Sequence, residues 1–238
     1  MPLQRQGQGP RAAARPDDAV SGAPLSPEAF GDRLAVSRET LDRFRLYAAL
    51  LVKWNRAINL VSPRSLDDLW RRHFLDSAQL RRHLPPLSGP QNRVIIDVGA
   101  GAGFPGLVLS LLGCGRVHLV EADQRKAEFL REATRVTGAD ALVHVQRVET
   151  LPTLAVDVVT CRAFAPLVEI LELTHRFLEP REPGKQPVAI FLKGRRADEE
   201  LTAALKKWRL QVERFESETD PEASILRLRL QSLGDEAT

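Results

Sequence analysis

Short apolar runs alternate with helix-like segments from about Arg93 onward, and this alternation most limits what the chain can fold into. It predicts an α/β fold, in which crossover helices cover both faces of a parallel sheet. The two last runs alternate polar and apolar residues and predict an antiparallel hairpin. The expected strands are 94–97, 117–121, 141–146, 156–161, 188–192, 210–215 and 225–230, and the expected helices are 123–137, 166–178 and 197–208.

The first apolar run leads into a glycine loop. Residues 97–106 have the sequence DVGAGAGFPG and precede the apolar segment 107–112. Alternate glycines allow positive φ angles and bring backbone N–H groups close to a ligand. Pro105 is expected in the first turn of the following helix, where its missing N–H costs nothing. The sequence therefore predicts a strand, a ligand-binding loop and a helix.

Two ligand classes compete for this loop. Gly101-x-Gly103-x-x-Gly106 fits the dinucleotide fingerprint, in which a pyrophosphate binds at the helix N-terminus. Asp97 favours S-adenosylmethionine instead, because a carboxylate repels pyrophosphate and attracts an ammonium or sulfonium. A charge pair near a protein surface contributes roughly 4 kcal/mol at about 4 Å before desolvation. The alternative is that Asp97 only accepts N–H bonds from the loop as a turn residue.

Two further acidic residues follow the next two strands. Glu121 ends the second run and comes 24 residues after Asp97, close to the interval expected of a ribose-binding acid. Glu149 follows the third run, where an adenine amino group is a suitable partner. Each of these acids alone is more often a solvated surface charge. Three acids after three successive strands point to one ligand-binding edge of the sheet.

The first part of the chain differs in composition. Residues 1–25 contain four prolines and no apolar period, which predicts a disordered tail. Residues 26–90 predict a helical region. Its three helices are expected to open on serine caps at Ser26, Ser37 and Ser65.

Composition places the chain among ordinary soluble proteins. Of its 238 residues, 43% are hydrophobic and 27% charged. The absence of a long apolar run and of a signal peptide predicts a cytoplasmic protein with no membrane association. Cys114 and Cys161 stand outside any Cys/His cluster, so neither a disulfide framework nor a metal site is expected.

The formal charge of +3 favours an anionic partner without requiring one. Basic residues cluster at 71–73, 81–83 and 193–196. Such clusters are either solvated helix faces or nucleic-acid contacts, and composition leaves both interpretations open.

Several short motifs follow one another between about residues 37 and 194: Trp54-Asn55, Asn59-Leu60, Arg72-His73-x-x-Asp76-Ser77, Asp97-x-Gly99-x-Gly101-x-Gly103-Phe104-Pro105-Gly106, Lys126-x-x-Phe129-Leu130, Arg147-x-Glu149, Arg162-Ala163-Phe164-Ala165 and Leu192-Lys193-Gly194. In these motifs and their order the chain resembles the GidB (RsmG) family of bacterial small-subunit rRNA guanine methyltransferases. The Arg-His-x-x-Asp-Ser and Arg-Ala-Phe-Ala elements are selective for this family, whereas the glycine loop marks only the wider superfamily.

The resemblance implies a class I S-adenosylmethionine-dependent methyltransferase (Rossmann-like) domain over residues 91–238, after the N-terminal helical extension. It implies formation of 7-methylguanosine in the decoding-centre loop of small-subunit (16S) rRNA. It also implies that Gly99 and Phe104 line the donor site, that Val148 and Glu149 hold the adenine end, and that Arg162 lies beside the reacting centre. The chain departs from the family at Cys161 and Ala100, where the family often has serine, and in its proline-rich tail.

The residues suggest how such a reaction would proceed. Guanine nitrogen-7 has a free lone pair on the major-groove edge, so no general base is required. Arg162 is an unsuitable neighbour for a purine that gains positive charge, and we expect it to hold the donor's carboxylate or an RNA phosphate.

RNA contacts are predicted from residue type and position. Arg72, His73 and Lys193 are the expected phosphate contacts. Phe164 or Phe104 is expected to stack on the target guanine, unless both belong to the core.

Two other functions are open from the sequence. One is a nicotinamide-dependent oxidoreductase, although the only tyrosine, Tyr47, lies upstream of the loop. The other is a non-catalytic rRNA-binding assembly factor. For the methyltransferase, the expected partner is small-subunit rRNA or a ribosomal assembly intermediate, and the expected state is a monomer.

Overall fold

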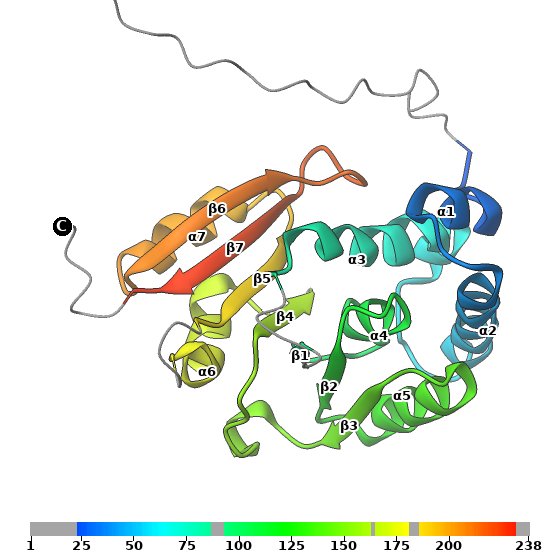
Figure 1. Cartoon of the computed structure of the whole chain (residues 1–238), viewed down its shortest axis with the longest axis horizontal. Coiled ribbons are helices and arrows are strands. Elements are labelled where there is room, and N and C mark those ends of the chain that lie inside the picture. The colour runs from blue at the N-terminus through cyan, green and yellow to red at the C-terminus, as the bar shows by residue number, and fades with distance from the viewer. Residues whose placement is uncertain (1–22, 87–92, 163–164, 181–185, 232–238) are drawn as a thin grey trace, which may run out of the picture.

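A seven-stranded mixed sheet forms the centre of the computed structural model, which describes residues 23–86, 93–162, 165–180 and 186–231 (Figure 1). The strand order is β3-β2-β1-β4-β5-β7-β6. This confirms the predicted α/β class and every predicted strand. The strands are β1 (Val94–Val98), β2 (Arg116–Glu121), β3 (Ala141–Val145), β4 (Val158–Arg162), β5 (Val188–Lys193), β6 (Leu210–Glu216) and β7 (Ser224–Leu230).

The order of strands reverses beside β1, which pairs in parallel with both β2 and β4. The connecting helices are α4 (Gly106–Leu111), α5 (Gln124–Thr137) and α6 (Leu167–Leu178). In open α/β sheets, ligands bind beyond the carboxyl ends of the strands at such a reversal. The topology therefore directs attention to the loops after β1, β2 and β4.

Helices cover both faces of the sheet, as predicted, and bury two hydrophobic clusters. Neighbouring residues of a strand point to opposite faces, so Ile95 joins the cluster under α4, α5 and the N-terminal helices. Ile96 joins the cluster under α6 and α7 (Ala197–Leu205). Helix α7 ends three residues earlier than the predicted 208.

Two of the predicted N-terminal helices begin where expected. Helices α1 (Pro27–Leu34) and α2 (Arg38–Asn55) start after Ser26 and Ser37, whose hydroxyls accept N–H bonds from the first turn. Helix α5 likewise ends at Gly138 in the left-handed conformation.

The third predicted helix is wrong in its start and its regularity. The segment consists of η1 (Pro63–Asp68), the π-helical turn η2 (Trp70–Leu75), α3 (Asp76–Ala78) and η3 (Gln79–His83). Ser65 does not cap it, because its hydroxyl donates to the Ser62 carbonyl at 2.6 Å. Figure 1 shows this segment between α1 and the β6–β7 hairpin.

The predicted hairpin is confirmed, but its place in the sheet was not predicted. Strand β7 pairs antiparallel with β5 as well as β6, so β6 forms the sheet edge. Pro105 is also displaced from its predicted position, because it precedes α4, which begins at Gly106.

Some expectations lie outside the described residues. Residues 1–22 of the predicted tail are among them, and the division into domains stays a prediction. In the ranges that the structure covers, no helix combines the length and apolarity that crossing a membrane requires.

Candidate active site

The glycine loop between β1 and α4 is packed tightly against the protein. Its glycines at 99, 101 and 103 have φ angles of 66°, 54° and 89°, as the sequence predicts. A Cβ at Gly103 would lie 2.5 Å from Tyr47 Oη, and one at Gly106 would lie 2.6 Å from Asp97 Oδ2. Tyr47, on helix α2, also donates a hydrogen bond to the Ala102 carbonyl. The N-terminal helices therefore brace the loop from below.

Asp97 is fully buried beneath this loop. Its Oδ2 accepts the Gly106 N–H at 2.8 Å, which is the turn role considered above. Burial raises the pKa of the Asp97 carboxyl to about 7, against the opposing effects of that hydrogen bond and of Arg162. Its Oδ1 has no hydrogen-bond partner among the described residues. Because buried polar atoms are nearly always paired, this oxygen suits a ligand's donor group.

Glu121 ends β2 and ties the loop to the sheet edge. Its Oε2 accepts the Gly101 N–H at 2.9 Å, and its Oε1 accepts the Asp123 N–H at 2.8 Å. Each carboxylate oxygen keeps a further lone pair that a hydroxyl could use. The arrangement is compatible with the predicted ribose contact.

Val148 and Glu149 lie beyond β3 on the short 3-10 turn η4 (Val148–Thr150). Val148 is buried and Glu149 is exposed. The strand order places this turn, Glu121 and Asp97 over three adjacent strands. Glu149 follows the strand by a turn and does not occupy its last position.

Arg162, the last residue of β4, is held on several sides. Its Nη1 donates to Asp76 Oδ2 at 3.2 Å and to the Arg72 carbonyl at 3.1 Å. Its guanidinium carbon lies 4.6 Å from the centre of the Phe104 ring, a cation–π contact. Nε and one Nη2 hydrogen have no partner in the part of the chain that the structure describes. The guanidinium is therefore fixed and still has donors to offer.

His73 does not lie where a phosphate contact requires it. The side chain is buried, its Nδ1 is 2.7 Å from Arg162 Nη2, and its Nε2 is 2.8 Å from Ser65 Oγ. Burial, with the nearby Arg162 and Arg72, lowers the pKa of His73 to about 3. Since Arg162 can only donate, Nδ1 accepts and Nε2 carries the proton. Both ring nitrogens of the neutral imidazole already have partners, so this arrangement does not favour the predicted phosphate contact, which stays a prediction.

Phe104 belongs to the core, which is the alternative to stacking on guanine that the sequence left open. The ring is 3% exposed and is stacked on His73 at 5.0 Å and on Tyr47 at 5.5 Å. Arg162 adds to this enclosure. Phe164, the other aromatic residue considered, lies outside the described residues.

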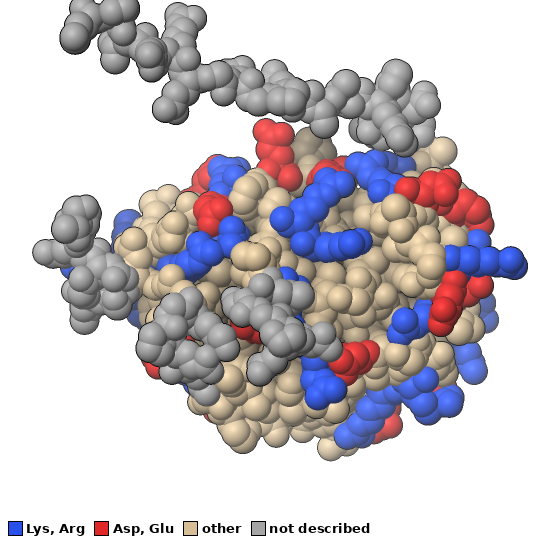
Figure 2. Space-filling model, in the orientation of Figure 1, with Lys and Arg blue, Asp and Glu red and all other residues tan. Residues whose placement is uncertain are grey.

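A cavity of about 730 Å³ opens beside Arg162. Arg72 is exposed at its rim, whereas Lys193 is 9% exposed and donates to Glu200 at 2.9 Å and to the Ala165 carbonyl at 2.8 Å. Lys193 is thus already paired, so a phosphate would have to compete with Glu200. Figure 2 shows Lys and Arg side chains gathered over the neighbouring segment that Figure 1 labels α3. The lining also includes Arg71, Asp76, Thr219, Asp220 and Pro221.

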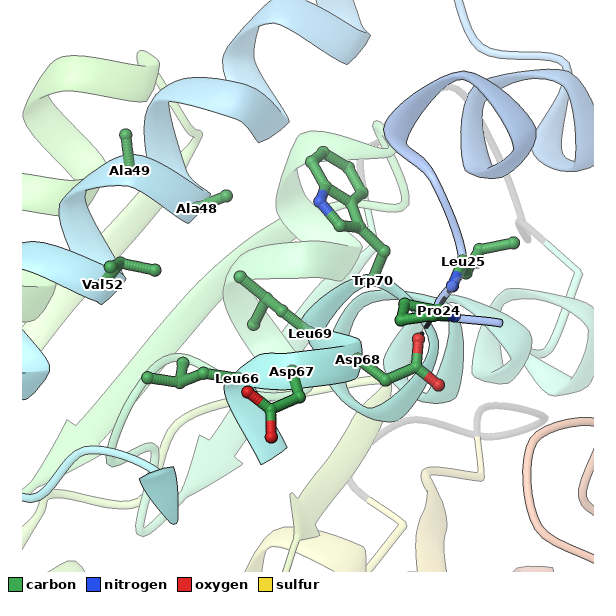
Figure 3. Close-up of a pocket in the computed structure, with 10 residues that line it drawn as sticks. All are labelled: Pro24, Leu25, Ala48, Ala49, Val52, Leu66, Asp67, Asp68, Leu69 and Trp70. Atoms are coloured by element: carbon green, nitrogen blue, oxygen red, sulfur yellow. Dashed lines mark hydrogen bonds between the residues drawn. The ribbon is translucent and has the colours of Figure 1, made fainter. Parts of the chain in front are cut away.

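A second, more apolar cavity of about 550 Å³ lies away from the loop. Figure 3 shows Ala48, Ala49 and Val52 of α2 opposite Leu66, Leu69 and Trp70. Its acidic neighbour Asp68 is already bonded to the Leu25 N–H at 2.9 Å and to Arg71. The other carboxylate of its lining, Asp67, is exposed, and the cavity holds none of the residues predicted for the site.

Sequence interpretation missed the residues that hold the site together. Asp76 was noticed only as part of a motif, although its spacing of three from His73 places both on one side of a helical turn. Thr219 carries no local signal, because it lies in a hairpin turn far along the chain. Tyr47 was noticed only as the single tyrosine of the chain, upstream of the loop.

Other chemistries find no support in the described residues. Cys161 is buried, and burial strongly raises the pKa of its thiol, so it is suited to packing and not to nucleophilic attack. Within the described ranges, no group of three or more His, Cys, Asp or Glu side chains is placed to hold a metal ion.

Comparison with known proteins agrees with this geometry. The family profile GidB, described as rRNA small subunit methyltransferase G, matches residues 40–224. A protein named Ribosomal RNA small subunit methyltransferase G from Rhodospirillum rubrum is 53% identical over 86% of this chain and 97% of its own length. The protein of the same name from Rhodospirillum centenum is 54% identical over 84% of this chain and 88% of its own length.

Solved structures of lower identity share the fold. An MtNAS variant in complex with S-adenosylmethionine superposes with a TM-score of 0.52 at 16% identity, covering 87% of this chain and 85% of that one. The fibrillarin/Nop5p complex gives a TM-score of 0.50 at 16% identity, covering 67% of this chain and 82% of that one.

Proposed function

The chain belongs to the GidB family and is an rRNA small subunit methyltransferase, and we propose that it transfers a methyl group from S-adenosylmethionine to guanine nitrogen-7 in the decoding-centre loop of small-subunit rRNA. One observation carries the proposal. Arg162 lies between the glycine loop, where it covers Phe104, and a basic-rimmed cavity of about 730 Å³. Family membership leaves the oxidoreductase interpretation of the loop without support.

The loop residues fit the proposed donor. The unpaired Oδ1 of Asp97 suits its ammonium group, and Glu121 at the end of β2 suits its ribose hydroxyls. We assign the donor to the loop formed by Gly99, Gly101 and Gly103, whose positive φ angles let the backbone turn closely beside it. We assign the adenine end to Val148 and Glu149 on η4. When bound, the donor supplies an activated methyl group on a positively charged sulfur.

The protein's task is then to position the acceptor. Guanine nitrogen-7 attacks through its lone pair, so no proton has to be removed first. The neutral His73 and the paired Lys193 fit a site that needs no general base. Correct alignment of reacting atoms can supply about 7–11 kcal/mol of the barrier reduction.

We assign Arg162 to an anionic oxygen of one of the two substrates. Its free Nε–H and Nη2–H donors suit a carboxylate of the donor or a phosphate of the RNA. Asp76, at 3.2 Å, offsets its charge and so reduces repulsion of a purine that becomes positive. Arg72, exposed at the cavity rim, is the phosphate contact that we retain.

The product nucleoside tests the proposal. Unmodified small subunits are incubated with the protein and methyl-labelled donor, and the RNA is digested and separated. The label is expected in 7-methylguanosine, and a label in any other nucleoside would refute the assigned acceptor atom. Arg162→Ala is expected to lower transfer strongly, whereas the control Arg135→Ala, which removes an exposed pair with Glu132 on α5, should not.

We further infer that the protein acts as a monomer in the cytoplasm on rRNA or on an assembly intermediate. Parallel assays with naked rRNA, immature particles and finished subunits would identify the preferred form. Light scattering of the purified protein tests the monomer, and a dimer mass would contradict it.

A further inference from the structure

The turn that joins β6 to β7 is anchored to the N-terminal helical segment. The buried Gln79 side chain donates to Ser217 Oγ at 3.1 Å and accepts the Glu218 N–H at 2.8 Å. Glu218 in addition pairs with Arg33 at 3.1 Å and with Arg82. These contacts hold the turn beside the cavity, whose lining includes Thr219 and its neighbours.

Thr219 reaches Arg162 through one intermediary. Its hydroxyl lies 2.6 Å from Asp76 Oδ1, and Asp76 Oδ2 lies 3.2 Å from Arg162 Nη1. Because the carboxylate can only accept, Thr219 donates. The Ser217 hydroxyl, at 3.0 Å, is then free to donate to Thr219, so the direction of the chain is defined.

This chain limits the rotation of the Asp76 carboxylate. A short hydroxyl-to-carboxylate bond is among the stronger neutral-to-charged hydrogen bonds. Gln79 Nε2 adds a weaker contact to the same Oδ1 at 3.1 Å. With Oδ1 held toward the turn, Oδ2 is directed at the guanidinium. The other contacts of Arg162 with described residues are those with His73, the Arg72 carbonyl and the ring of Phe104.

We propose that Thr219 is a positioning residue, which acts through Asp76 to orient Arg162 toward its anionic partner. The β6–β7 turn is then a working part of the active site and not merely the end of a hairpin. The inference rests on the proposed role of Arg162 in substrate binding. It concerns the orientation of that side chain, not an additional contact with substrate.

Thr219→Val removes the hydroxyl at nearly constant volume, and Thr219→Ser keeps it. Methyl transfer to small subunits and calorimetric binding of S-adenosylhomocysteine are measured for both. Thr219→Val is expected to lower kcat/KM by about tenfold or more, while Thr219→Ser stays within about threefold of the parent protein. The matched control is Thr202→Val on the exposed side of α7, whose hydroxyl bonds only the Asp198 carbonyl at 2.8 Å.

The two measurements also distinguish the anions. Weaker binding of S-adenosylhomocysteine to Thr219→Val would assign Arg162 to the donor's carboxylate. An increased KM for subunits with unchanged binding of that ligand would assign it to an RNA phosphate. Either result supports the inference.

A double-mutant cycle separates positioning from a structural role. If Thr219 acts through Arg162, Thr219→Val causes no further loss in an Arg162→Ala background. If Thr219→Val lowers kcat/KM equally in the parent protein and in the Arg162→Ala variant, the inference is refuted. A general folding defect of Thr219→Val would give this same additive result. Unchanged kinetics of Thr219→Val beside a defective Arg162→Ala would refute it as well, and would leave the proposed function standing. Unchanged transfer by Arg162→Ala would instead refute the assigned role of that arginine.

Discussion

Gly106→Ala is expected to destabilise the protein, although alanine normally favours a helix. Gly106 is the first residue of α4 and has no positive φ angle, so its backbone conformation suits alanine. In an exposed helix, the change would stabilise by about 1 kcal/mol. In this protein, the change in stability depends on the atoms that the added methyl group would contact.

The added Cβ would lie 2.6 Å from Asp97 Oδ2 and 2.8 Å from Leu119 Cδ2, both fully buried side chains. Overpacking of this kind costs about 1–3 kcal/mol. Displacing Asp97 would also break its 2.8 Å bond from the Gly106 N–H, which costs another ~1–3 kcal/mol for a buried polar group. After subtraction of the helix gain, the free energy of unfolding should fall by about 1–5 kcal/mol.

Urea unfolding measures this change directly. Gly194→Ala is the matched control, because its added Cβ meets no atom within 4 Å. The control is expected to leave stability within about 1 kcal/mol of the parent protein. Gly106→Ala should also bind S-adenosylhomocysteine more weakly under conditions in which the variant is still fully folded. If Gly106→Ala unfolds at the same urea concentration as the parent protein, the close packing of the loop on Asp97 is refuted.

Three other predictions concern buried polar groups. Tyr47→Phe removes the hydroxyl that donates to the Ala102 carbonyl. Urea titration should show a free energy of unfolding lower by about 1–3 kcal/mol, and S-adenosylhomocysteine should bind more weakly. A variant with unchanged stability and binding would contradict the bracing role of Tyr47. The pKa of Asp97 is about 7 in the folded protein, against 3.8 in the unfolded chain. Its contribution to stability is therefore complete below pH 3.8 and is lost as the pH rises toward 7. Asp97→Asn should remove this slope from the pH dependence of the free energy of unfolding. The pKa of His73 is lowered from 6.5 to about 3. Its contribution to stability is therefore present above pH 6.5 and is lost as the pH falls toward 3. NMR at about pH 5 should find a neutral ring protonated on Nε2, and an imidazolium at that pH would contradict the hydrogen-bond network.

Local signals in the sequence predicted the elements on which the site is built. The serine caps at 26 and 37, the C′ glycine at 138 and the positive-φ glycines of the loop depend on neighbouring residues, and each was found as predicted. The strands followed from their apolar runs for the same reason. The order of the strands in the sheet was not predicted.

The remaining features depend on contacts between distant residues. Asp76 and Thr219 are 143 positions apart, and no periodicity brings them together. His73 was predicted as a phosphate contact because it lies beside Arg71 and Arg72 in a basic cluster. The pKa of His73 is lowered by burial and by the nearby Arg162 and Arg72, and its burial against Phe104 and Arg162 exists only in the folded chain. The π-helical turn η2 likewise places Phe74 against Phe104 of the loop, a contact between distant positions.

The hydroxyl of Tyr47 on the Ala102 carbonyl has a consequence for engineering this enzyme. Because helix α2 supports the proposed donor loop through a buried hydrogen bond and a stacked ring, we expect that the helical region cannot be exchanged as an independent module. A chimera that retargets the enzyme to another RNA would have to retain the inner surface of α2 and vary only its solvent side. By the same reasoning, we expect relatives with different RNA preferences to differ on the solvent side of α2 and to keep Tyr47.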